Sequence, residues 1–217
     1  MTGIIVAMEE EAQGVINRLT DAKKTTIIKK PVYIGKLFGK DVVIALSNIG
    51  KINAAATTQS IIDKFGVDNI KNFGTAGGIK NKVQPLKYYS VDKCCQYDFD
   101  LSTIDDVEIG HIQGFDSVYF TAKKDVFDFL PAANVASSDH FTESEKDINI
   151  VSDLDCTLFD MELGAIGQVC TLNCVPFAAV KGVTDVHGSG ADGNTFAKNL
   201  KTVCDGFYDI LEKALNK

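Results

Sequence analysis

Short apolar runs alternate along this sequence with segments of helical periodicity, and this alternation constrains the fold more than any other feature. The apolar runs predict strands, whereas the segments between them repeat apolar residues every three or four positions and predict helices. Predicted strands cover 3–7, two pieces of 31–47 joined at Gly39–Lys40, 68–78, 87–92, 132–136 and 175–183; predicted helices cover 9–19, 53–65, 160–172 and 195–215. Strands interleaved with helices predict an α/β three-layer sandwich.

Length, charge and hydropathy narrow the class further. A chain of 217 residues with 45% apolar content predicts one domain, spanning residues 1–217, with a sizeable core. The net charge of −7 argues against nucleic acid or an anionic membrane as a partner. Apolar runs are too short to cross a bilayer, and the N-terminus MTGIIVAMEEE lacks the basic region of a signal peptide. We therefore expect a cytoplasmic protein.

The cysteines give no pattern of metal binding. Six are present, none forms a CxxC pair, and Cys170 and Cys174, at helical i, i+4 spacing, have no histidine nearby. The three histidines are too scattered to form a ligand cluster. We expect buried, reduced thiols, as in most cytoplasmic proteins, with no metal and no cofactor.

Polar or small residues follow five of the predicted strands. Open α/β sheets bind ligands at the carboxyl ends of their strands, so these termini predict one shared pocket. They are Glu9–Glu11, Asn48–Gly50, Thr75–Gly78, Asp139–His140 and Asp185. Taken singly, each also fits an ordinary turn or helix start, and GTAGG lacks the GKS/T ending of a phosphate-binding P-loop.

Taken together and in order, six motifs resemble one family. MEEE, NIGKINAAA, NFGTAGG, SSDHF, DMELGAIGQVC and VKGVTD resemble the signature series of the 5′-methylthioadenosine/S-adenosylhomocysteine nucleosidases, within the nucleoside phosphorylase superfamily. The resemblance runs from about Gly3 into the C-terminal helix. It implies a nucleoside phosphorylase-like fold with a central mixed twisted sheet, a purine nucleoside substrate and a homodimer. The implied reaction hydrolyses the N-glycosidic bond of 5′-methylthioadenosine and releases adenine, with S-adenosylhomocysteine as a second candidate substrate.

The resemblance implies catalytic roles for three carboxylates. Glu11 would help to activate the attacking water, Glu162 would hydrogen-bond the ribose hydroxyls, and Asp185 would protonate or hydrogen-bond N7 of adenine. These residue types suit the chemistry, because protonating the purine and stabilising an oxocarbenium-like sugar both lower the barrier. To donate a proton near neutrality, Asp185 needs a pKa raised by burial.

The same resemblance assigns the substrate contacts. Thr75 would position Asp185. Phe141 would stack on the purine, while backbone groups of Phe141 and Thr142 would read its edge. Met161 would pack under the sugar.

Further implied contacts concern the 5′ group and the water. Ile49 and Phe196 would line the pocket for the 5′-alkylthio group. Lys181 stands near the expected water, where bacterial relatives usually have arginine. The largest departure from the family lies in CCQYDFDLSTIDDVEIGHIQGF, where Asp105 and Gln113 occupy places that usually send apolar contacts into a partner subunit.

Water is favoured over phosphate as the nucleophile. Phosphorylases of the superfamily bind phosphate with arginines, often just ahead of the glycine turn, where this chain has Asn72. Arginine suits bidentate phosphate binding, and the sequence contains one, Arg18, inside the first predicted helix. Two alternatives stay open: an enzyme for another purine nucleoside, whether nucleosidase or phosphorylase, and a non-catalytic nucleoside-binding protein.

Overall fold

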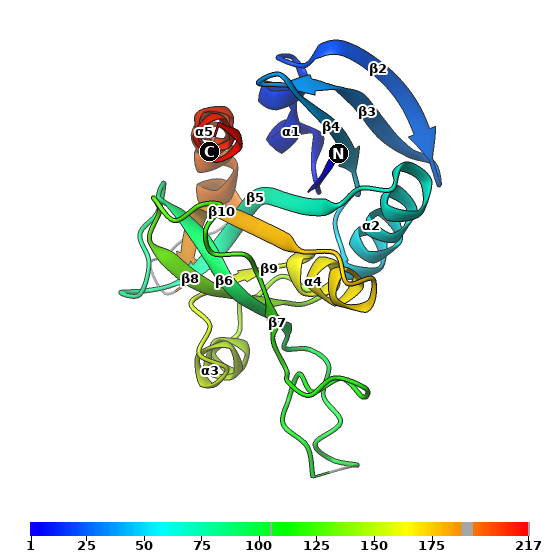
Figure 1. Cartoon of the computed structure of the whole chain (residues 1–217). Helices are drawn as coiled ribbons and strands as arrows, with labels where there is room; N and C mark the ends of the chain where they lie inside the picture. Colours follow the sequence, from blue (N-terminus) through cyan, green and yellow to red (C-terminus); the bar gives the residue numbers. More distant parts are fainter. Residues whose placement is uncertain (105, 188–192, 217) are drawn as a thin grey trace.

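The computed structural model describes residues 1–104, 106–187 and 193–216 (Figure 1). Its strands are β1 (Thr2–Val6), β2 (Thr20–Ile27), β3 (Lys30–Leu37), β4 (Lys40–Leu46), β5 (Asn69–Ile79), β6 (Tyr88–Gln96), β7 (Phe120–Thr121), β8 (Ala132–Ser137), β9 (Leu158–Asp160) and β10 (Phe177–His187). Its helices are α1 (Glu9–Ile16), α2 (Lys51–Phe65), α3 (Glu145–Asp153), α4 (Leu163–Leu172) and α5 (Gly193–Leu215).

The strands of the described residues form one mixed sheet, in the order β10-β6-β8-β9-β5-β1-β4-β3-β2, with β7 paired to β6. β1 lies parallel to both β4 and β5, and β5 is also parallel to β10. Because β10 pairs with both β5 and β6, the strands β5, β9, β8, β6 and β10 close into a ring. The α/β class and central mixed sheet agree with the prediction, and the ring is a feature that the apolar runs could not reveal.

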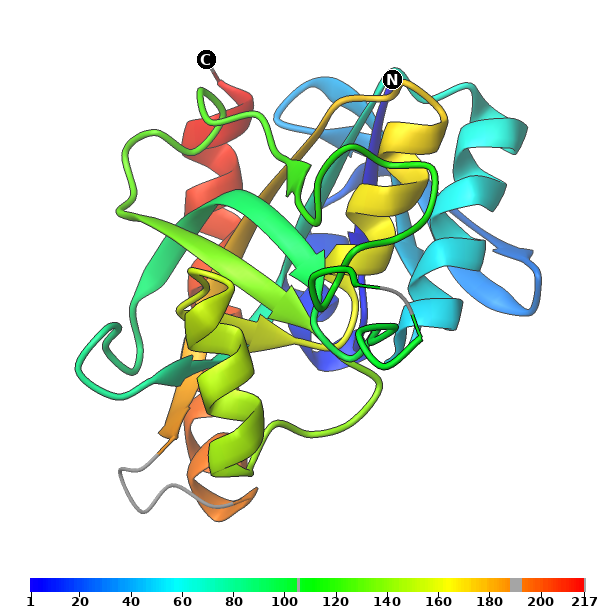
Figure 2. The ribbon, with the colours of Figure 1, turned by 90° about the horizontal axis from the view of Figure 1, so that it is seen from below.

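Helices cover the two faces of this sheet. α2 and α4 lie side by side on one face, whereas α1 and α5 pack together on the other (Figures 1 and 2). Ile61 of α2 and Ile166 of α4 are fully buried in the hydrophobic core on the first face. Phe207 of α5 is fully buried in the core on the other face, where its ring centre lies 5.0 Å from that of Phe73. Each such side chain contributes roughly 1.5–3 kcal/mol by leaving water.

Several elements differ from the sequence prediction. β2, α3, β7 and β9 were not expected; β2 is mostly exposed and its sequence shows no apolar face. The first helix ends at Ile16 instead of position 19, because the N–H groups of Arg18 and Leu19 donate hydrogen bonds to the carbonyls of Val15 and Ile16, three residues back, and so leave the helical pattern. Asp160 belongs to β9 and not to the following helix, since it pairs with Ser137 of β8.

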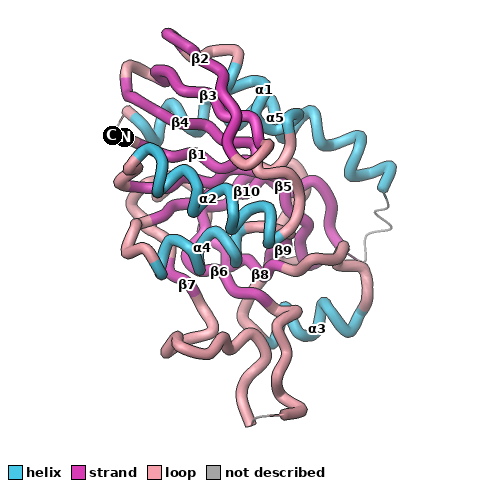
Figure 3. Tube along the Cα trace, turned by 90° about the vertical axis from the view of Figure 1, so that its right-hand side faces the viewer, coloured by secondary structure: helices cyan, strands magenta, loops and turns pink. Residues whose placement is uncertain are grey.

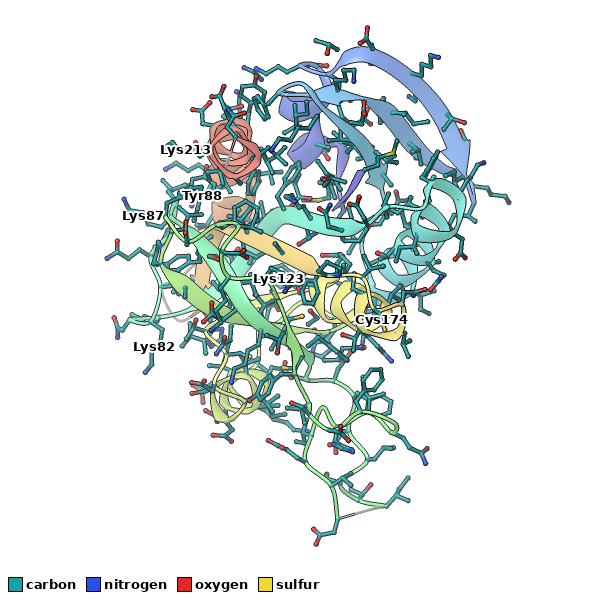
Figure 4. The ribbon with its side chains drawn as sticks, viewed as in Figure 1. Lys82, Lys87, Tyr88, Lys123, Cys174 and Lys213 are labelled. Carbon is teal, nitrogen blue, oxygen red and sulfur yellow. The ribbon has the colours of Figure 1, made fainter. Side chains whose placement is uncertain are left out.

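The described residues of the segment 97–119 form a long loop that extends away from the sheet between β6 and β7 (Figures 1 and 3). The cysteines are free thiols and five are buried, whereas Cys174 at the end of α4 is exposed, contrary to expectation (Figure 4). Cys174 lies beyond Leu172, the last residue of α4, in the connection to β10. None of the described helices is long and apolar enough to span a membrane.

Candidate active site

A cavity of about 270 Å³ lies where the carboxyl ends of β1, β5, β9 and β10 meet the loops that follow β4 and β8. Its walls are Ala7, Met8, Glu11, Ile49, Thr75, Ala76, Gly77, His140, Phe141, Thr142, Phe159, Asp160, Met161, Glu162, Thr184, Asp185 and Phe196. Of the ten site residues predicted from the sequence, nine line this cavity and Lys181 does not.

Glu11 is fixed by the first turn of α1 and by the end of β5. Its Oε1 accepts hydrogen bonds from the N–H and the hydroxyl of Thr75, at 2.7 and 2.8 Å, and its Oε2 accepts from the N–H of Met8 at 3.1 Å. Gly74 is needed here, because a Cβ at this position would lie 3.2 Å from Oε1. Burial raises the pKa of Glu11, while the Thr75 N–H and the charge of Lys181 act in the opposite direction.

A buried lysine supports the carboxylates from behind the cavity wall. The Nζ of Lys181 lies 2.7 Å from Oδ2 of Asp160, and both side chains are 1% exposed. Asp160 also accepts hydrogen bonds from the Ser137 hydroxyl and from the N–H of Leu163 at 3.1 Å. Burial lowers the pKa of Lys181, but the carboxylates around it outweigh burial and the net shift is upward.

The expectation that Lys181 contacts substrate is therefore corrected. Lys181 lies opposite Gly74 in the β10–β5 ladder, four residues before Asp185, so it is deeper in the sheet than the cavity. Its charge acts on the cavity through Asp160, Glu162 and Glu11.

Glu162 precedes the first residue of α4 and points back to the N-terminus of α2. Its Oε1 accepts a hydrogen bond from the N–H of Gly50 at 3.0 Å. Burial and the nearby Asp160 raise the pKa of Glu162 to about 7, against the opposing effects of Lys181 and the Gly50 N–H. A carboxyl with this pKa exchanges a proton near neutral pH.

Asp185 has a different environment. Its Oδ1 accepts a hydrogen bond from the hydroxyl of Thr184 at 2.7 Å. Burial raises the pKa of Asp185, and the Thr184 hydroxyl only partly opposes this shift. In the described part of the chain no cation pairs with Asp185. The carboxyl is therefore biased towards its neutral form, which can donate a proton.

The expected contact between Thr75 and Asp185 is wrong. The register pairs Thr75 with Gly182, while Asp185 pairs with Gly77 after an irregularity in β10. The hydroxyl of Thr75 therefore reaches Glu11, and the hydroxyl on Asp185 is that of Thr184.

A second polar network supports the loop after β8. The hydroxyl of Tyr97 lies 2.7 Å from that of Thr142 and 3.2 Å from Nε2 of His140. His140 also lies 3.4 Å from Asp147 of α3. This network holds the segment that places Phe141, which is 53% exposed, beside the cavity.

The sequence did not predict several of the residues that support the site. Asp160 and Thr184 adjoin predicted site residues. The partner of Asp160, Lys181, is brought to it by strand pairing, whereas Thr184 contacts its neighbour Asp185. The Tyr97 network joins segments that are distant in the sequence, so no local sequence pattern predicted it. Of the two departures in the long loop, Gln113 is exposed and Asp105 lies outside the described residues.

Comparisons with known proteins agree with this fold. The phosphorylase superfamily model matches residues 2–216. The chain is 33% identical over 196 residues to the 5'-methylthioadenosine/S-adenosylhomocysteine nucleosidase of Exiguobacterium sp., covering 84% of each protein. It is 31% identical to that of Colwellia psychrerythraea over 218 residues, covering 92% of this chain and 89% of the relative.

A solved structure of the Colwellia psychrerythraea nucleosidase in complex with adenine superimposes with a TM-score of 0.88 at 28% identity, covering 98% of this chain and 95% of that one. The chain belongs to the phosphorylase superfamily and, within it, to the 5'-methylthioadenosine/S-adenosylhomocysteine nucleosidase family.

Proposed function

We propose that this protein hydrolyses the N-glycosidic bond of 5′-methylthioadenosine and releases adenine, with S-adenosylhomocysteine as a second substrate. The observation that carries the proposal is that Glu11, Glu162 and Asp185 line one cavity, with Asp185 buried away from any described cation. The family supports it, since the relatives are nucleosidases for these two compounds. A protein that only binds nucleosides has no need of such an acid.

Each carboxyl has a distinct task in the proposed reaction. Asp185 donates its proton to N7 of adenine while the electron pair of the C1′–N9 bond passes to the base. Water attacks C1′ and gives a proton to Glu11, and Glu162 binds the ribose hydroxyls. Burial raises the pKa of Asp185 and so favours the protonated carboxyl, whose proton stabilises the leaving base as the bond breaks.

Uncharged residues of the cavity wall bind the purine, the sugar and the 5′ group of the substrate. Phe141 stacks on the purine, and the backbone of Phe141 and Thr142 reads its edge. Met161 packs under the sugar. Ile49 and Phe196, two apolar side chains of the cavity wall, contact the 5′-alkylthio group.

Water is the proposed nucleophile because the cavity wall offers phosphate no lysine or arginine among the described residues. Arg18 is occupied elsewhere, with its guanidinium 4.4 Å from the ring centre of Tyr208 and hydrogen-bonded to the carbonyl of Gly14. Asn72 donates to the carbonyl of Ile5 inside the sheet. Phosphate sites in proteins normally contain arginine or lysine side chains that bind the phosphate oxygens.

The direct test is adenine release from 5′-methylthioadenosine in phosphate-free buffer, repeated with phosphate. We expect free adenine and methylthioribose at a rate that phosphate does not raise. Methylthioribose 1-phosphate as the main product would contradict hydrolysis. The release of no adenine under either condition would favour the alternative of a non-catalytic nucleoside-binding protein.

We also propose a homodimer in which the segment from Asp98 to Phe115 completes the partner's cavity. Apolar side chains on α2, the loop and α4 support this, since Ile52 is 81%, Ile104 78% and Leu172 65% exposed. Exposed apolar groups of this size mark contact surfaces. A monomeric mass in solution at micromolar concentration would refute the dimer.

Two wider inferences accompany the dimer. Residues 1–217 form one domain, because β1 and β10 both pair with β5 and α5 packs against α1. The enzyme is cytoplasmic, because its thiols are free and mostly buried.

Polar Gln113 and Asp105 lead us to propose a weaker preference for the methylthio group than is usual in the family. One lost methyl-sized contact is worth roughly 1 kcal/mol, so adenosine should compete several-fold better. A kcat/KM for 5′-methylthioadenosine more than about a thousandfold above that for adenosine would show an intact 5′ pocket instead.

A further inference from the structure

A closed ring of polar contacts joins the N-terminus of α2 to the loops that follow β6 and β8. The ammonium of Lys51 forms an ion pair with Oδ1 of Asp98. Oδ2 of Asp98 accepts a hydrogen bond from the N–H of Asp139 at 2.9 Å, and Oδ1 of Asp139 accepts from the N–H of Lys51 at 2.7 Å. The Lys51 and Asp98 side chains are only 14% and 18% exposed, so water competes weakly for them.

The ring lies next to the hydrogen bond that orients Glu162. Consecutive N–H groups of Gly50 and Lys51 donate to Glu162 and Asp139, respectively. Gly50 has a φ of 103°, which other residues rarely adopt, and a Cβ here would lie 3.3 Å from Oδ1 of Asp139. The conformation that aims the Gly50 N–H at Glu162 is therefore fixed from the far side by Asp139.

We propose that Asp98 is a positioning residue, which holds Lys51 and Asp139 together and thereby keeps the Gly50 N–H on the Glu162 carboxylate that binds the ribose hydroxyls. The substrate named here rests on the proposed function, whereas the contact itself does not. Asp98 begins the long loop, so the same carboxylate anchors that loop beside the sugar end of the cavity.

Glu162 faces Asp160, Glu11 and Lys181 as well as the Gly50 N–H. The N–H stabilises the charged carboxylate and acts to lower its pKa, so losing this donor should raise the pKa of Glu162 further. A ring that merely stabilised the fold would not change this proton equilibrium.

The experiment compares Asp98→Asn and Lys51→Met with the wild type. Asp92→Asn is the matched control. Asp92 lies on β6, the strand that leads to Asp98, and forms an ion pair with Lys124, and neither residue is in the cavity wall. We expect KM for 5′-methylthioadenosine to rise about tenfold in both ring variants, the size of one lost hydrogen bond to a charged group, with kcat changed less than about threefold.

Independently of activity, ¹³C NMR titration of labelled glutamate carboxyls should show the pKa of Glu162 moving upward in both ring variants, with Glu162→Gln identifying the resonance. The control should match the wild type in both readouts. A wild type that releases no adenine refutes the proposed function, and the titration alone then decides the role of Asp98.

An unchanged pKa of Glu162, or an unchanged KM in an active enzyme, overturns the proposal. Equal changes in Asp92→Asn overturn it too, because the effect would then be general. Loss of folded protein in both ring variants overturns it as well, since the ring would then serve the fold and not Glu162.

Discussion

The cavity holds two kinds of carboxyl environment. Glu11, Asp160 and Glu162 surround one buried lysine, and the pKa values of Glu11 and Glu162 both depend on its charge. Asp185 lies away from this cluster, and its pKa is set by burial and by the neighbouring Thr184 hydroxyl. Protonation of Glu11 and Glu162 therefore depends on shared neighbours, whereas protonation of Asp185 is local. Substitutions in the cluster should therefore change stability and pH response, and substitutions at Asp185 should change turnover alone.

The largest expected effect is that of Asp185→Asn on catalysis. The amide keeps the shape of the side chain but cannot donate the proton, so kcat should fall by on the order of 10²- to 10⁴-fold with little change in KM. Steady-state kinetics measure this, and circular dichroism checks the fold. A variant that keeps more than about a tenth of kcat would move the acid role elsewhere, first to His187 at the end of β10.

Lys181→Met should destabilise the fold more than any change at Asp185. Removing the lysine leaves buried carboxylates without a cation, which typically costs about 3–5 kcal/mol of unfolding free energy. Urea unfolding near neutral pH measures it. Lys201→Met is the control, since its pair with Asp205 is exposed and should contribute hardly anything. Equal stability of the Lys181 variant and the wild type would show that the cluster does not depend on its lysine.

Glu162→Gln should alter how stability depends on pH. The folded-state pKa of about 7 lies above the ordinary 4.5, so the folded state binds this proton more tightly than the unfolded chain does. The resulting stability is fully present below the ordinary pKa and is lost as pH rises through about 7. From about pH 5 to about pH 8 the glutamine variant should therefore gain on the order of 2 kcal/mol relative to wild type. Urea midpoints across this range test it, and a constant difference would contradict the shifted pKa.

The sequence predicted the strands whose apolar character is continuous. β1, β5 and β10 are buried in the middle of the sheet and read as apolar runs, and their polar ends line the cavity. β2 was missed because it is an exposed edge strand whose TDAKKTTI sequence has no apolar face. α3 was missed for a related reason, since Val151 is its buried residue.

The candidate residues came from family motifs, but their partners depend on long-range register. Asp160 meets Lys181 because the ring of strands closes through β5 and β10. The irregularity in β10 brings Thr184, and not Thr75, to Asp185. The contact between Asp160 and Lys181 could not be predicted from local periodicity, because it joins strands whose order in the sheet is not their order in the chain. Thr184 and Asp185 are neighbours in one strand, and only their side-chain geometry required the structure.

The smallest expected effect tests how local Asp185 is. Thr184 is fully buried and its hydroxyl donates to the carboxylate, which favours the charged form. Thr184→Val keeps the shape but removes the donor, so the pKa of Asp185 should rise further. A neutral hydrogen bond is worth about 0.5–1.5 kcal/mol, so the alkaline limb of the kcat profile should move upward by at most about one pH unit. Thr184→Ser keeps the hydroxyl and should restore the wild-type profile. The pKa of Glu162, followed by NMR, should stay unchanged in both variants, because the cluster does not share the Asp185 proton. A downward shift of the limb, or a concerted change at Glu162, would show that the two carboxyl environments are coupled after all.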